Sequence, residues 1–163
     1  MYLMRKRKDN KVPFEDMEYE DWVACKVGYW RKANAIHKWF VDKVQNGIDD
    51  CSYYLVNYKN IQELKDICDK ILQDVIARPG KVKNGETYNH ESQKWEPNWE
   101  NGKEIVNKEL CEQLLPTQDG FFFGSTDYDE FYLDDVKLTS EILEKVLKET
   151  DFENEEIYYS SSW

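Results

Sequence analysis

YYLVNYKNIQELKDICDKILQDV, residues 53–75, contains the two patterns that decide the fold class. The first four residues have the aromatic and β-branched character of a strand. Behind them, apolar residues recur at spacings of three and four, which predicts a helix that ends before the Arg78-Pro79-Gly80 break. Asn60 stands three residues before Glu63, and this variant of the capping box predicts that the helix begins near Asn60.

Similar patterns lie on both sides of this stretch. Helical spacing predicts helices over 28–46, ending at Gly47, and over 105–114, ending at Pro116. Another helix is expected after Ser125 or Thr126, with an inward stripe formed by Tyr132, Val136, Thr139, Leu143 and Val146. Strands are predicted at 1–4, as an edge strand, at 120–124, as a buried strand, and at 157–159.

Helices and strands thus alternate irregularly, and the chain contains no repeat. A length of 163 residues is typical of one domain. We therefore expect an α+β fold in which residues 1–163 form a single globular domain, with a small sheet of three to five strands packed against three or four helices.

Residues 79–102 interrupt this order. They are rich in Pro, Gly, Asn and charged residues, which predicts a long polar loop or hairpin. Trp95 and Trp99 lie four residues apart within it. Two interpretations stay open: the tryptophans anchor the segment on the body of the protein, or they form an exposed aromatic contact patch.

The charge is strongly acidic, with 33 Asp and Glu against 22 Lys and Arg and a net charge of −11. Residues 127–163 carry twelve acidic residues and three lysines, which leaves a net charge of −9 in that segment alone. Binding to a phosphate backbone depends on Lys and Arg contacts, so this balance disfavours direct nucleic-acid binding. An acidic surface fits a basic partner, or serves only to keep the protein in solution.

The sequence contains no run of about 18 apolar residues and no apolar segment behind the basic start at Met1 to Lys8. We therefore expect a cytoplasmic protein without a membrane span. Its four cysteines, Cys25, Cys51, Cys68 and Cys111, are scattered and expected to be reduced. Their spacing and the presence of only two histidines predict no zinc site, and we expect no cofactor.

The first candidate site is the segment 28–40. On a helix, Arg31, Asn34 and Lys38 share one face and can hold a phosphate or carboxylate, although such a face also pairs with neighbouring acids. His37 lies on the apolar stripe, where it is either a hydrogen-bonded core residue or a general base or anion contact. No catalytic triad order or phosphate loop accompanies it. The sequence therefore leaves open whether the protein is an enzyme, and it favours a protein without catalytic activity.

The second candidate site is the segment 114–132. Its two glycines allow close backbone approach, and a helix start leaves backbone donors for an anion. The candidate ligand contacts here are Thr117, Gln118, Ser125 and Thr126. Ser125 and Thr126 are equally typical of ordinary N-caps. Paired carboxylates such as Asp127 and Asp129 are a weak signal for a divalent cation, and we expect no metal site.

Both segments resemble an uncharacterised family of small proteins from bacteriophages, prophages and bacterial genomes. The likeness rests on GYWRKANAIHKWF at 28–40, LPTQDGFFFGSTDYD at 115–129 and YYSSSW at 158–163. No activity is assigned to the family. Small acidic phage-type proteins without catalytic motifs often inhibit host defence systems, as anti-CRISPR proteins and nucleic-acid mimics do. The resemblance therefore implies an accessory binding protein that acts in the cytoplasm of a bacterial host.

Two main hypotheses follow. In the first, a non-enzymatic inhibitor docks on a basic, nucleic-acid-binding effector of bacterial defence through Asp127, Asp129, Asp134, Asp135, Glu153, Glu155 and Glu156. In the second, the chain sequesters or acts on an anionic, nucleotide-like ligand held by Arg31, Asn34, His37, Lys38, Thr117, Gln118, Ser125 and Thr126. A structural or virion role is least favoured because there is no repeat or assembly helix. The sequence leaves the oligomeric state open.

Overall fold

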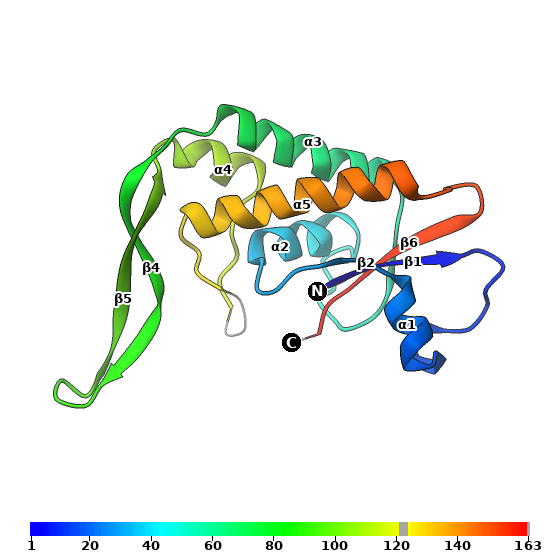
Figure 1. Cartoon of the computed structure of the whole chain (residues 1–163), viewed down its shortest axis with the longest axis horizontal. Coiled ribbons are helices and arrows are strands. Elements are labelled where there is room, and N and C mark those ends of the chain that lie inside the picture. Colours follow the sequence, from blue (N-terminus) through cyan, green and yellow to red (C-terminus); the bar gives the residue numbers. More distant parts are fainter. Residues whose placement is uncertain (121–123, 163) are drawn as a thin grey trace.

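The computed structural model describes residues 1–120 and 124–162. The three phenylalanines of the strand predicted at 120–124 lie outside these residues. Within the described residues the chain has an α+β fold, as predicted, with five α-helices, a four-stranded sheet and a two-stranded hairpin (Figure 1). The fifth helix is α1 (Tyr19–Cys25), which follows a short 3-10 turn at Phe14–Asp16 in a segment for which no element was predicted.

The four-stranded sheet is antiparallel throughout, in the order β2-β1-β6-β3. Its strands are β1 (Tyr2–Arg7), β2 (Lys26–Tyr29), β3 (Tyr54–Val56) and β6 (Glu155–Ser160). The prediction of an edge strand at 1–4 is wrong, because β2 and β6 flank β1 on its two sides. Residues 26–29, of which the sequence analysis placed the last two in a helix, form the edge strand on one side of the sheet, and β3 forms the other edge.

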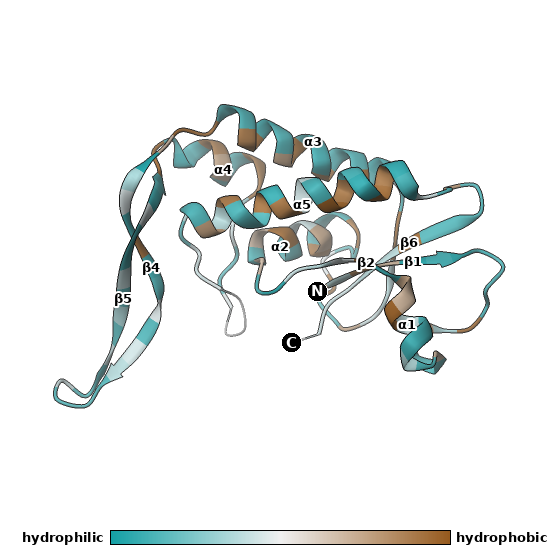
Figure 2. Ribbon diagram, viewed as in Figure 1, coloured by the Kyte–Doolittle hydropathy of each residue, from teal (hydrophilic) through white to brown (hydrophobic). Residues whose placement is uncertain are grey.

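Two helices, α2 (Asn34–Lys43) and α5 (Glu130–Glu149), pack on one face of this sheet, and α3 (Tyr58–Asp74) runs along α5 (Figure 1). The predicted inward stripe of α5 is buried at all five positions. Figure 2 shows that hydrophobic residues of α2, α3 and α5 lie mainly where these helices face one another. No helix in the described part of the chain has the length and apolar character needed to cross a membrane.

Several helix starts differ from the prediction. Lys32 has a left-handed φ of 62°, which turns the chain between β2 and α2, so α2 begins at Asn34 rather than at residue 28. The capping box of α3 pairs Asn57 with Asn60 instead of Asn60 with Glu63. In addition, α4 (Lys108–Leu114) starts late because Ile105 still belongs to a strand.

Side chains of the central strands alternate between two apolar layers. On the helical side, the ring of Tyr159 stacks on Phe40 with centroids 4.0 Å apart, and Leu3 is fully buried beside it. On the opposite side, Phe14 packs against Tyr158, with ring centroids 5.3 Å apart. The segment around Phe14, for which the sequence predicted no element, therefore covers the second face of the sheet.

Residues 77–105 form a hairpin, here called the arm, in which β4 (Ala77–Asn89) pairs with β5 (Lys94–Ile105). The arm projects from the body of the molecule (Figure 1). Of the two predicted alternatives for this segment, a loop or a hairpin, the structure has the hairpin. Its base is held by buried Val82 and Ile105, and Gly102 lies so close to the Glu130 side chain that a Cβ would collide with it. Further out, the arm is mostly hydrophilic (Figure 2).

The cysteines differ in environment. Cys68 and Cys111 are buried, Cys25 is partly exposed and Cys51 is exposed, and all four are free thiols. Burial raises the pKa of Cys68 to about 12, so this thiol stays protonated and acts as a small apolar core residue.

Gly28 provides a test of the packing between β2 and α5. A Cβ at this position would lie 2.8 Å from Ile142 Cγ2 and 3.1 Å from Leu3 Cβ. We expect Gly28→Ala to lower the free energy of unfolding by about 1–3 kcal/mol through overpacking, as measured by urea denaturation. The double variant Gly28→Ala/Ile142→Ala should lose less stability than the sum of the two single variants, and strict additivity would contradict the close contact.

Candidate functional site

The two sequence clusters meet at a pocket of about 450 Å³. One wall comes from the turn before α2 and from its first residues, and the facing wall comes from the loop at 124–129 and the first turns of α5. The bulge of β4 at 83–85 closes a third side, at the inner part of the arm. The proximity of the two clusters, which the second hypothesis requires, is therefore present in the structure.

Asn34 holds the two walls together. Its side-chain amide donates a hydrogen bond to the carbonyl of Ser125 at 2.8 Å, and its Oδ1 accepts one from the backbone N–H of Gln118 at 3.2 Å. The side chain is buried, and both of its polar atoms serve these contacts. Asn34 therefore positions the site rather than offering a free group to a ligand.

Two cations without an ion pair in the described part of the chain line the pocket. Arg31 and Lys32 are exposed, line the pocket, and make no ion pair or side-chain hydrogen bond within residues 1–120 and 124–162. A third lining lysine, Lys83, is already paired with Glu86 at 2.6 Å. The free positive charge thus lies on the side of α2.

The opposite wall is acidic. Four of its carboxylates line the pocket, and none pairs with a Lys, Arg or His in the described residues: Asp127, Asp129, Asp134 and Asp135. Asp129 caps α5, because its Oδ1 accepts the backbone N–H of Phe131 at 2.9 Å and of Tyr132 at 3.3 Å. The predicted caps at Ser125 and Thr126 are wrong, since Ser125 instead closes a turn on Asp127 with a 2.9 Å hydrogen bond.

Burial and mutual repulsion perturb two of these groups. Burial, followed by the charges of Asp134 and Asp129, raises the pKa of Asp135 from 3.8 to about 7. Burial also raises the pKa of Asp129, although the two N–H groups that it accepts oppose the shift. Carboxyl groups that resist ionisation in this way are frequent at functional sites.

The remaining predicted ligand contacts are placed differently. Thr117 lines the pocket, but its hydroxyl donates a hydrogen bond to the carbonyl of Thr126. Thr126 is not one of the lining residues. The Gln118 side chain and Lys38 are also outside, and Lys38 pairs with Asp42. His37 is fully buried, with Nδ1 2.7 Å from the Tyr159 hydroxyl and Nε2 3.2 Å from Asp49 Oδ1, which is the core role that the sequence allowed.

The predicted partner-contact acids fall into two groups. Asp127, Asp129, Asp134 and Asp135 lie around the start of α5, whereas Glu153, Glu155 and Glu156 follow its end. A 20-residue helix is about 30 Å long, so the groups lie at opposite ends of α5. In the second group, Glu155 pairs with Arg5 at 3.7 Å and Glu156 accepts the Tyr158 hydroxyl at 2.6 Å. Those two acids have structural roles that the sequence did not show.

Some lining residues were missed. Lys32 was predicted to lie in a helix, and no local sequence pattern predicted its left-handed backbone conformation. Asn84 and Gly85 line the pocket because residues 83–85 of the arm lie beside the start of α5, which no local pattern indicates. The cap at Asp129 was visible in principle, because Asp is a favoured N-cap and an apolar helical stripe begins at Tyr132.

The site fits binding by charge and hydrogen bonds. No His or Cys is among its lining residues, and the described residues contain no group of three or more His, Cys, Asp or Glu suited to a metal ion. Comparison with known proteins adds nothing further: no family model, no curated protein and no solved structure matches the chain.

The raised pKa of Asp135 predicts a pH dependence of stability. Between about pH 4 and pH 7 the unfolded protein has ionised Asp135 while the folded protein keeps it protonated, so its contribution to stability falls as pH rises through this window. We expect Asp135→Asn to raise the free energy of unfolding at about pH 8 by about 1–3 kcal/mol, and by clearly less at about pH 5.

Urea denaturation at both pH values measures this difference. Glu141→Gln is the matched control, because Glu141 is an exposed acid on the same helix without an ion pair in the described residues. An equal effect of Asp135→Asn at both pH values would show that Asp135 ionises normally.

Proposed function

We propose that this chain is a non-enzymatic binding protein that docks on a basic protein partner. Its docking surface consists of the acidic start of α5, namely residues 127–135, and the adjoining arm. The observation that carries the proposal is that this segment holds five acidic residues without one ion pair among the described residues: Asp127, Asp129, Glu130, Asp134 and Asp135. Burial raises the pKa of Asp129 and Asp135, so the negative charge of the surface rests mainly on Asp127, Glu130 and Asp134.

Other acids on the same body are compensated. On α3, Asp69 pairs with Lys65 at 2.6 Å and Asp74 pairs with Lys70 at 2.8 Å. The uncompensated group at 127–135 therefore concentrates negative charge around the start of α5. The potential of such a group accelerates association with a positively charged surface and discriminates against acidic partners.

The arm adds apolar contact area beside this charge. It carries five basic and five acidic residues, so its net charge is zero while the body carries the whole −11. Trp95 and Trp99 are 65% and 59% exposed, which contradicts the interpretation that they anchor the segment on the body. Because they lie four apart in one strand, both project from the same face of β5. Exposed tryptophans in such a position are typical of interface hot spots.

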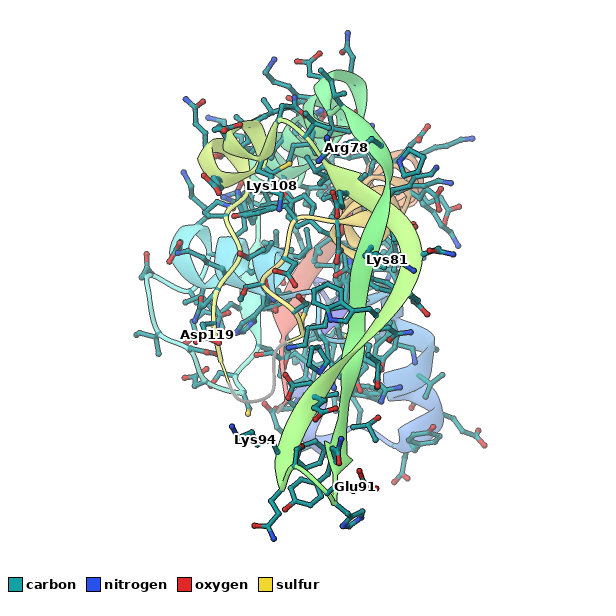
Figure 3. All side chains as sticks on the ribbon, turned by 90° about the vertical axis from the view of Figure 1, so that its left-hand side faces the viewer. Arg78, Lys81, Glu91, Lys94, Lys108 and Asp119 are labelled. Carbon is teal, nitrogen blue, oxygen red and sulfur yellow. The ribbon has the colours of Figure 1, made fainter. Side chains whose placement is uncertain are left out.

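The base of the arm lies next to the acidic start of α5. An isolated antiparallel β-bridge between the backbones of Glu104, near the end of β5, and Asp129 joins them. Figure 3 shows the side of the molecule that carries the arm, with Glu91 and Lys94 at its outer tip and Arg78 at its base. A partner that contacts the acidic segment thus meets the arm as well. Together with the resemblance to phage proteins, this supports a partner that normally binds nucleic acid, such as a basic effector of bacterial defence.

A charge variant tests the docking surface. The immobilised protein is incubated with a bacterial lysate at low salt, and a basic nuclease or defence subunit recovered from it is purified and assayed for inhibition. We expect Asp127→Asn/Asp134→Asn to weaken inhibition at least about tenfold, because the encounter depends on these charges. Glu141→Gln/Glu144→Gln, an equal charge change further along α5, should inhibit like the unmodified protein. Equal inhibition by both variants would contradict the proposed surface.

A second variant tests the arm. Since Trp95 and Trp99 are exposed, we expect Trp95→Ala/Trp99→Ala to leave the melting temperature unchanged within about 2 °C. Affinity for the purified partner should fall about 30-fold or more, because truncation of even one hot-spot tryptophan costs at least about 2 kcal/mol. Exposed Tyr19→Ala on α1, remote from the arm, is the control. Unchanged affinity of the double variant would remove the arm from the interface.

A further inference from the structure

The pocket itself has two chemically different ends, and this carries an inference beyond protein docking. Its volume of about 450 Å³ lies within the range of small-ligand sites, roughly 300–1,000 Å³. The unpaired cations are on the α2 side and the unpaired carboxylates are on the α5 side. Charges of opposite sign that face one pocket without pairing leave both sets available to a ligand.

The α2 end suits an anion. Ala33 precedes this ten-residue helix and has no side chain that could cap it, and its first turn contains no acidic residue. The backbone N–H groups at the start of a helix have no partner within the helix and lie at its positive end. Asn34, Ala35 and Ile36 line the pocket, and Arg31 and Lys32 stand beside them. This combination of helix start and cations binds phosphate groups.

At the α5 end of the pocket, one buried carboxylate oxygen has no hydrogen-bond donor in the described part of the chain. Asp129 is only 4% exposed and lines the pocket, and its Oδ2 has no hydrogen-bond partner among the described residues. Its other oxygen already accepts two backbone N–H groups. A buried carboxylate oxygen without a partner is an unusual feature in a folded protein, and a ligand N–H would satisfy it.

We propose that the pocket binds a free nucleotide, with its phosphate at the start of α2 beside Arg31 and Lys32 and an N–H group of its base on Asp129 Oδ2. Guanine is the base best suited to the acidic wall, because it presents an N1–H and a 2-amino group on one edge. The net charge of −11 disfavours a long polynucleotide, since the body would repel its backbone. The ligand is thus one that carries an anion at one end and N–H donors at the other.

Binding can be measured by isothermal titration calorimetry on the full chain with guanosine 5′-monophosphate, guanosine, inorganic phosphate and a short single-stranded oligonucleotide. The monophosphate should bind at least about tenfold more tightly than guanosine or phosphate alone, because each of these occupies only one end. Equal affinity for phosphate and the monophosphate, tighter binding of the oligonucleotide, or no heat with any probe at millimolar concentration would each overturn the proposal.

Variants assign the two ends. Arg31→Ala should weaken binding of guanosine 5′-monophosphate about tenfold or more, whereas Arg78→Ala, which removes an exposed arginine at the base of the arm, should not change it. Asp129→Asn keeps a favoured helix cap but replaces the free acceptor, so it should reduce affinity for the monophosphate and leave affinity for phosphate unchanged. Unchanged binding by both pocket variants would overturn the proposal, even if docking on a protein partner were demonstrated.

Discussion

Pairing between β1 and β6 joins residues from opposite parts of the sequence, with Tyr2 opposite Ser160 and Arg7 opposite Glu155. These are the two central strands, so β2 and β3 can only add to the sheet at their outer edges. The pairing also forms the apolar surface on which α2 and α5 pack, because Leu3 and Tyr159 lie next to each other in register. Without it, neither helix has a continuous surface to cover, and the first turns of both helices would not face each other across the pocket.

Local patterns predicted the elements that carry their own signal. The helices α3 and α5 were expected because apolar spacing continues over four or more turns, and β6 because Ile157, Tyr158 and Tyr159 are consecutive strand formers. The start of α2 was missed because a lysine, which has no preference for left-handed backbone, turns the chain at residue 32. The central place of β1 was missed because its neighbours come from distant segments. Strand propensity indicates that a strand exists but not which strands will flank it.

The sequence identified some residues of the site but not the way in which they are arranged. Arg31, Thr117 and Ser125 were named from composition and spacing, and all three line the pocket. What could not be foreseen is the side-chain amide of Asn34, which connects segments about 90 residues apart and fixes their separation. His37 is buried in the core, as its place on an apolar stripe indicated, and Tyr159 and Asp49 contact its ring. Acidic residues near the end of α5 were grouped with those at its start only because they are close in sequence.

The order of strands in the sheet also determines how far the sheet can fold while the chain is still being made on the ribosome. The main partner of β1, β6, is made about 150 residues after it, at residues 155–160. At about 5–20 residues per second, β1 waits roughly 7–30 s with one edge unpaired while the helices and the arm are made. Ribosomes that stop before residue 155 therefore release chains with an open strand edge and an uncovered apolar face, which are substrates for chaperones and proteases.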